Sequence, residues 1–168
     1  MADYNGSAEN PNSNPATNSE AGAVKLFTIG FTKKSAEHFF EAIAASGAKR
    51  IVDVRLHNVS QLAGFAKKDD LAYFLKNICD VEYVHLPMLA PTERLLDDYR
   101  KRRCDWRRYE SEFLSLMKER EIERHLPREV IADGCLLCSE DQPHHCHRRL
   151  VAEYLNDKWG GIGIEHLV

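Results

Sequence analysis

Two short blocks near the C-terminus combine residue types that can do chemistry. The first, Leu136 to Glu140, is an apolar run that ends in a thiol and a carboxylate. The second, Cys146-His147-Arg148, opens a helix-like segment after a polar loop. In α/β proteins reactive groups gather where buried strands end and helices begin. Backbone N–H groups at a helix start also favour anions, including a thiolate. We therefore expect part of an active site or ligand site here.

The residue types in these blocks suit nucleophilic and acid–base chemistry. Cys146 lies beside His147 and near a helix start, and both features lower the pKa of a thiol. Glu140 is a candidate general acid or base. Cys138 supplies a second thiol, and Arg148 offers a fork of N–H donors for a phosphate or carboxylate. The sequence predicts catalytic roles for the two cysteines, the histidine and the glutamate, in hydrolysis or group transfer on an anionic substrate.

Two other interpretations of this cluster stay open. Cys135-x-x-Cys138 has the spacing of a zinc site, with Cys146 and His147, or His144 and His145, completing it. Residues three apart on a strand point to opposite faces, and adjacent Cys146 and His147 rarely reach one ion, so we predict no metal ligands and folding without zinc. In the purely structural interpretation, the two thiols are buried packing residues and Arg148 pairs with an acidic neighbour.

Short apolar segments alternate with amphipathic ones from Val24 onward. Strands are expected at Val24–Ile29, Arg50–Leu56, Val81–Leu86, within Glu129–Cys138 and at Ile162–Val168. Helices are expected from a Ser35 cap to Ser46 before Gly47, from Asp69 or Asp70 to Asn77, and over Thr92–Arg103, Trp106–His125 and Arg148–Lys158, with a loop at 57–68. This alternation predicts an α/β fold: a single Rossmann-like domain with a mostly parallel sheet of about five strands and flanking helices.

Polar side chains follow the ends of several expected strands. Thr32 follows the first strand, Arg55 the second and His85 the third. Because the carboxyl ends of parallel strands meet at one edge, these side chains should share a crevice with the Cys138 block. We predict ligand-binding roles for them and for Arg148. The alternative for Arg55 is a purely structural ion pair with a nearby carboxylate, and the alternative for His85 is a buried side chain whose hydrogen bonds are made within the protein.

Composition bounds the class of protein. The 168 residues are 43% hydrophobic and 29% charged, as in a globular domain. Residues 1–23 contain few apolar residues, and this composition predicts a disordered tail. A single domain is expected to follow at 24–168. Without the tail the chain holds 23 basic and 23 acidic residues, which argues against broad electrostatic binding of nucleic acid.

The expected cellular location of the protein rests on two missing sequence signals and on the number of cysteines. The sequence contains no apolar run of about 20 residues, the length needed to span a membrane, and no visible signal peptide. Five cysteines, an odd count, then indicate thiols in a reducing cytoplasm. A membrane partner is therefore not expected.

A basic and aromatic segment runs from Arg100 to Arg108, with Trp106 inside it and Tyr109 next to it. Interleaved basic and aromatic side chains can hold single-stranded nucleic acid. Acidic residues follow closely, so a solvated helix face is the favoured interpretation, and nucleic acid stays a second possible partner.

Five blocks in order carry a resemblance to a known family: Thr28-Ile29-Gly30, Val52 to Arg55, Tyr83 to Pro87, Leu136 to Glu140, and Cys146 to Arg148. Together they resemble the domain-of-unknown-function family 488, DUF488, over residues 24–168. The resemblance implies a small Rossmann-like α/β domain and no settled activity. Many members have His-Ser after the first glycine where this chain has Phe31-Thr32, and a Pro-Arg-rich segment where it has Leu56 to Gln61.

Taken together, the sequence predicts an enzyme acting on a small anionic or nucleotide-like substrate through a Cys/His/Glu/Arg crevice. The alternative is a non-catalytic module that binds a ligand or nucleic acid, with a Cys/His zinc site as one version. The sequence names no cofactor.

Residues 1–23 should be dispensable for folding, because their composition buries too little apolar surface to offset the entropy lost on ordering. Deleting them should leave the midpoint of thermal unfolding nearly unchanged. A large drop in that midpoint would show that the segment packs on the domain.

Overall fold

The structure is a computed structural model that describes residues 24–59 and 63–168; the predicted tail and residues 60–62 of the predicted loop lie outside this range. The strands are β1 (Val24–Gly30), β2 (Arg50–Asp53), β3 (Glu82–His85), β4 (Gly134–Cys138) and β5 (Ile162–Leu167). The helices are α1 (Ala36–Ser46), α2 (Lys68–Phe74), α3 (Glu93–Arg100), α4 (Trp106–Glu119), α5 (Ile122–His125), α6 (Arg128–Ile131) and α7 (His147–Trp159). The described residues also form three short turns of helix, at Gly64–Ala66, Leu75–Cys79 and Pro87–Leu89.

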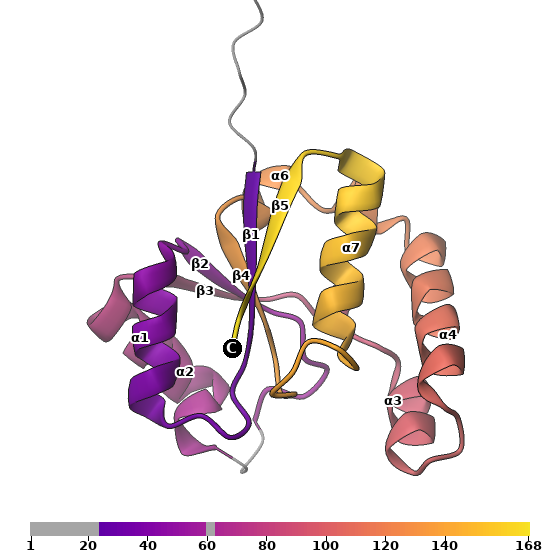
Figure 1. Ribbon diagram of the computed structural model, residues 1–168, viewed down its shortest axis with the longest axis horizontal. Coiled ribbons are helices and arrows are strands. Elements are labelled where there is room, and N and C mark those ends of the chain that lie inside the picture. Colours follow the sequence, from indigo (N-terminus) through magenta and orange to yellow (C-terminus); the bar gives the residue numbers. More distant parts are fainter. Residues whose placement is uncertain (1–23, 60–62) are drawn as a thin grey trace, which may run out of the picture.

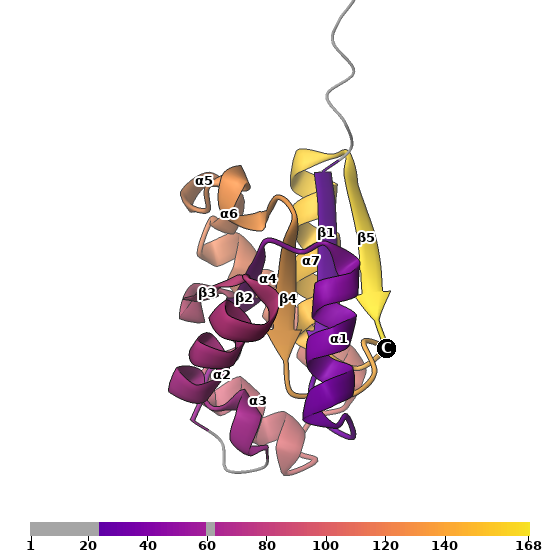
Figure 2. The same ribbon diagram turned by 90° about the vertical axis from the view of Figure 1, so that its left-hand side faces the viewer.

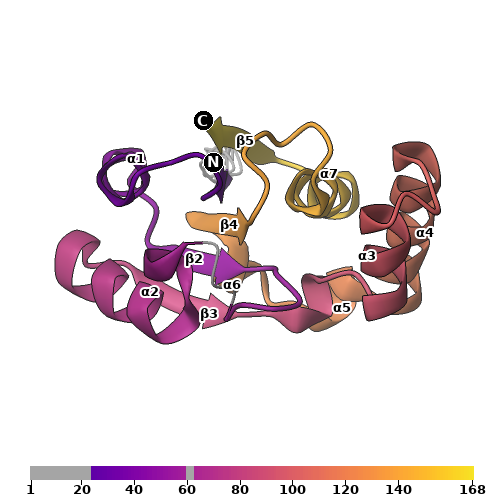
Figure 3. The same ribbon diagram turned by 90° about the horizontal axis from the view of Figure 1, so that it is seen from below.

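Within the described residues, the five strands form one parallel sheet in the order β3-β2-β4-β1-β5. Helices cover both faces: α1 and α2 lie on one side, and α3, α4 and α7 lie on the other (Figures 1 and 3). The predicted α/β fold with a parallel sheet is confirmed. A parallel sheet places all its strand ends at one edge, and Figure 2 shows β4 and β5 pointing toward the same end of the molecule.

Two hydrophobic cores lie on opposite faces of the sheet. One contains Phe39 and Ile43 of α1 and Leu71 of α2. The other contains Phe113 of α4 and Leu150 of α7. Strand β4 contributes to both, and all of its residues are buried, which explains why it reads as an unbroken apolar run.

The helix signals were partly correct. The Ser35 hydroxyl accepts a hydrogen bond from the backbone N–H of His38 at 3.1 Å, and Gly47 ends α1 with φ at 76°, both as predicted. The predicted cap of the next helix was wrong. That helix begins after Lys67, and Asp69 and Asp70 lie in its first turn, where carboxylates favour the helix dipole.

Several predicted elements end earlier than expected, and in two of them the structure shows the local cause. Strand β2 ends at Asp53 because its carboxylate accepts a hydrogen bond from the backbone N–H of Arg55 at 3.1 Å, which turns the chain. The helix predicted over Trp106–His125 is broken at Glu121, whose φ of 47° is left-handed. Side-chain bonding and local backbone conformation set both limits.

Gly30 ends β1 where the loop after β4 crosses it, and this packing yields a stability prediction. A Cβ atom on Gly30 would collide with the carbonyl oxygen of Glu140 and the guanidinium of Arg148. Gly30→Ala should lower the free energy of unfolding by about 1–3 kcal/mol, the scale of overpacking. Gly163→Ala in β5 is the control, because its Cβ would lie 3.9 Å from the nearest atom. Equal losses in urea denaturation would contradict a close approach at Gly30.

Candidate functional site

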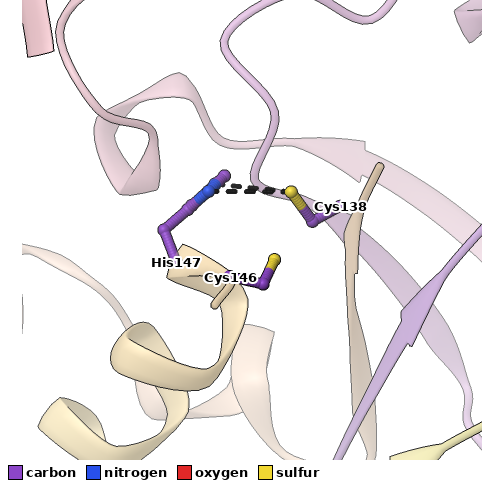
Figure 4. A group of neighbouring side chains, drawn as sticks. All are labelled: Cys138, Cys146 and His147. Carbon is purple, nitrogen blue, oxygen red and sulfur yellow. Dashed lines mark hydrogen bonds between the residues drawn. The ribbon is translucent and has the colours of Figure 1, made fainter. Parts of the chain in front are cut away.

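Cys138, Cys146 and His147 meet at the carboxyl edge of the sheet (Figure 4). Cys138 is the last residue of β4, Cys146 caps the start of α7, and His147 is the first residue of that helix. The sulfur atoms and an imidazole nitrogen all lie within 4.8 Å of one another, and all three residues are buried. The two blocks that stood out in the sequence are thus neighbours in space, joined by the loop 139–145.

The ring of His147 lies against the Cys138 thiol and is held there by a backbone carbonyl group. Its Nε2 lies 2.8 Å from the carbonyl oxygen of Val54. A carbonyl only accepts, so Nε2 carries the hydrogen and the neutral ring has its lone pair on Nδ1. Cys138 Sγ lies 3.6 Å from Nδ1 and 3.9 Å from Nε2. Phe113 contacts the ring edge-on at a centroid distance of 5.6 Å. The thiol and the imidazole are therefore in contact.

The two thiols differ in acidity because they compete for one negative charge. A hydrogen bond from Cys146, aided by the positive charges of His147 and Arg148, lowers the pKa of Cys138 well below its ordinary value despite burial. Burial, followed by the neighbouring Cys138, raises the pKa of Cys146 well above that value. Burial would lower the pKa of His147, but the charge of Cys138 outweighs it and raises that pKa. These opposite shifts favour ionisation of Cys138 before Cys146.

Arg148 fixes the loop between the two cysteines. It is fully buried, with the guanidinium donating through Nη1 to the carbonyl of Glu140 and through Nη2 to that of Asp141 at 2.9 Å. Its Nε lies 3.4 Å from the Thr28 hydroxyl, and Nη1 lies 3.4 Å from Cys146 Sγ. Its donors are thus directed at the protein's own oxygen and sulfur atoms.

Arg55 is likewise engaged by the protein. Its guanidinium makes two bonds to the buried Asp53 carboxylate, at 2.8 and 2.6 Å, and a third to the carbonyl of Ala66 at 2.9 Å. The Tyr83 hydroxyl donates to the same carboxylate at 2.6 Å. Burial lowers the pKa of Arg55, but bonding to Asp53 outweighs it and raises that pKa. This geometry matches the alternative given for Arg55 from the sequence, a structural ion pair with a nearby carboxylate.

A pocket with a cavity volume of about 50 Å³ opens above the cluster. Within the described residues its wall is made by Arg55, Leu56, His57, Pro91, Leu96, Tyr99, Arg100, Trp106, Tyr109, Cys138, Ser139, Glu140, His145, Cys146 and His147. Arg55, Cys138, Glu140, Cys146 and His147 were singled out from the sequence, and the pocket brings them together. Burial, followed by the charge of Cys138, raises the pKa of Glu140.

Three predicted ligand-binding residues do not belong to that wall in the described chain. His85 lies behind it, with Nε2 donating to the carbonyl of Arg55 at 2.8 Å. Thr32 supports the loop, because its backbone N–H donates to the carbonyl of Ser139 at 3.1 Å. Arg148 supports the same loop from inside, as described above. The structure thus separates groups that face the pocket from groups that position them.

The sequence analysis missed the wall opposite the cysteines. Tyr99 and Arg100 come from the end of α3, and Trp106 and Tyr109 from the start of α4. The rings of Trp106 and Tyr109 stack at 5.2 Å. The basic and aromatic segment at 100–108 was the available signal, but it was interpreted as a solvated helix face.

The cluster also has the composition of a metal site. Two thiols and one imidazole form a ligand set that zinc accepts. The prediction that Cys135 and Cys138 face opposite sides of the sheet is confirmed, since they belong to different cores. Adjacent Cys146 and His147, which rarely reach one ion, both lie close to Cys138 here, because the turn at the start of α7 directs both toward it.

Comparisons with known proteins give one match. The model of the family described as "Domain of unknown function DUF488" matches residues 35–155, more than half of the chain. The searches of curated proteins and of solved structures give no match. In the part of the chain that the structure describes, no helix is long and apolar enough to cross a membrane.

Replacing Arg148 tests whether it positions the loop. Arg148→Ala removes the buried donors of two carbonyl groups and leaves a cavity, and it should lower the free energy of unfolding by at least about 3 kcal/mol. Arg124→Ala is the control, because Arg124 is exposed and pairs with Glu121 at the surface, so its loss should cost less than about 1 kcal/mol. Urea denaturation measures both. Equally small losses would instead favour a ligand-binding role for Arg148.

Proposed function

The chain belongs to the DUF488 family, and we propose that it is an enzyme in which Cys138 attacks a small anionic substrate with His147 as its base. The proposal is carried by the 3.6 Å separation of Cys138 Sγ from His147 Nδ1, with Nε2 held by the Val54 carbonyl. A nucleophile in contact with a base, and the base oriented by a third group, is the arrangement that activates a thiol.

The nucleophile is Cys138, and Cys146 has a supporting part. The sequence alone favoured Cys146, because it is adjacent to the histidine. The lowered pKa of Cys138 and the raised pKa of Cys146 support the opposite assignment. Cys146 then acts as the hydrogen-bond donor that stabilises the thiolate.

Glu140 is the proposed general acid–base group of the pocket. It lies two residues after Cys138 in the pocket wall. Because its pKa is raised, a larger fraction is protonated near neutral pH, which suits donation of a proton to a leaving group. Arg148, His85 and Thr32 are proposed to position the loop and the residues around it.

The pocket wall supports an anionic substrate. Arg100 belongs to it, together with the stacked rings of Trp106 and Tyr109. The start of α7 adds backbone N–H groups at the same edge. A basic side chain beside aromatic rings suits a phosphate joined to a base, so we infer a nucleotide or a nucleic-acid component as the anionic group. The cysteines of the described chain are free thiols, and we propose the reducing cytoplasm as the location.

A second candidate function is a binding module without turnover that holds zinc at Cys138, Cys146 and His147. The convergence of three ligand atoms within 4.8 Å favours it. The two candidates differ in what the thiols do: zinc would bind all three ligands in the purified protein, whereas the enzyme needs an unliganded, reactive Cys138.

The pH dependence of alkylation tests the enzyme proposal. Because its pKa is lowered, Cys138 stays a thiolate as the pH falls from 9 to 7, and its reaction with iodoacetamide should slow only slightly. Cys104, whose pKa is raised by burial, should slow about tenfold per pH unit. Peptide mass spectrometry measures each rate. Cys146→Ala removes the hydrogen bond to Cys138 and should restore a steep pH dependence at Cys138, whereas Cys79→Ala should not.

Two outcomes would contradict the enzyme proposal. One is a Cys138 that reacts no faster than Cys104 at pH 7 in metal-free protein. The other is stoichiometric zinc in the purified protein, with alkylation of Cys138 and Cys146 only after treatment with a chelator, which would support the binding module.

A further inference from the structure

Cys138 and Cys146 form a pair of thiols in one pocket. They lie at the two ends of the loop 139–145, their sulfur atoms are within 4.8 Å, and both belong to the pocket wall. Figure 4 shows both sulfur atoms directed into the space between the end of β4 and the start of α7. Cys135, only three residues before Cys138, lies in the core on the opposite face of the sheet. The folded structure, and not closeness in sequence, therefore decides that Cys138 is paired with Cys146 and not with Cys135.

A second thiol at this position has a distinct chemical consequence. A cysteine that carries an acyl group is freed when water or another acceptor attacks the thioester, and a neighbouring thiol adds nothing essential. A thiolate that is oxidised to a sulfenic acid is different, because a neighbouring thiol condenses with it to a disulfide. That condensation protects the sulfur from irreversible oxidation.

We propose that Cys138 and Cys146 form an oxidation site that reacts with a small hydroperoxide and closes to a disulfide. The inference rests on the proposed function in one respect, the reactive Cys138 thiolate. It goes beyond that function because it assigns Cys146 a covalent role and adds a hydroperoxide as a reactant. The disulfide blocks the nucleophile and so switches the enzyme off until a small dithiol reduces it.

The Cys138 thiolate attacks the outer oxygen of the hydroperoxide, the O–O bond breaks, and the alkoxide or hydroxide leaves with the electron pair. His147 supplies the proton that converts it to an alcohol or water. The Cys146 thiol then attacks the sulfenic sulfur of Cys138, and the hydroxyl group leaves as water with the thiol proton. Two thiol groups of the reducing dithiol later restore both cysteines and become a disulfide themselves.

Burial of both thiols favours a small oxidant. Cys138 and Cys146 belong to the pocket wall, but their residues are only 4% and 2% exposed. An oxidant must therefore bring its reacting atom to a buried sulfur atom, which a small hydroperoxide does more easily than a bulky molecule that carries a disulfide. Arg148 Nη1 lies 3.4 Å from Cys146 Sγ, and this donor stabilises Cys146 as the leaving thiolate when the disulfide is reduced.

Hydrogen peroxide is the probe for the experiment. The full-length protein is treated with a small excess, free thiols are blocked, and digestion without reductant is followed by mass spectrometry. The expected product links the peptides of Cys138 and Cys146 with the loss of two hydrogen atoms, and dithiothreitol reverses it. Cys146→Ser should instead accumulate a sulfenic acid at Cys138, trapped by a dimedone probe. Cys138→Ser should abolish the disulfide at Cys146, because the partner sulfur atom within 4.8 Å is then missing.

Cys104→Ser is the matched control and should form the Cys138–Cys146 disulfide at the rate of the unmodified protein. The inference is overturned if Cys138 is oxidised directly to sulfinic acid, or if the disulfide links another pair of cysteines. It is also overturned if peroxide leaves both thiols unchanged in protein whose Cys138 is readily alkylated. That last outcome would leave the proposed function standing, whereas a Cys138 inert to both reagents would remove both.

Discussion

Arg148 carries a positive charge into the protein interior, where main-chain carbonyl groups of the loop after β4 satisfy it. A buried guanidinium is costly unless its donors are used. When its donors bind the carbonyl groups of the loop, they hold the loop close to Gly30, where a Cβ atom would collide with it. That arrangement sets where Glu140 enters the pocket and where α7 begins. The position of both cysteines relative to His147 follows from this single buried group.

The low polarity of the site gives the cluster its chemical asymmetry. Two thiols side by side in a buried space cannot both ionise, because like charges in low dielectric repel strongly. The positive charges of the imidazole and the guanidinium, with a hydrogen bond from Cys146, lower the pKa of Cys138, whereas burial and the neighbouring Cys138 raise the pKa of Cys146. A modest difference in position thus gives two neighbouring thiols different acidities.

Most of the fold could be predicted from local sequence signals. Alternating apolar and amphipathic segments indicated the parallel α/β sheet, and Ser35 with Gly47 marked both ends of α1. The errors lie where a side chain or one residue's backbone angle overrides periodicity. Asp53 turns the chain by bonding Arg55, and Glu121 breaks a helix through a left-handed conformation. Residue types alone do not reveal either event, because each depends on conformations that other residues could adopt.

The sequence by itself determined which groups arrive at the reactive edge. Cys138, Glu140 and Cys146 follow a buried strand or precede a helix, and a parallel sheet collects such positions in one place. Only the tertiary structure decided what each group does there. His147 is oriented by a carbonyl 93 residues away, and Arg148 is turned inward to Thr28, 120 residues away. Side-chain direction and pKa depend on such distant partners, and their positions exist only after the chain has folded.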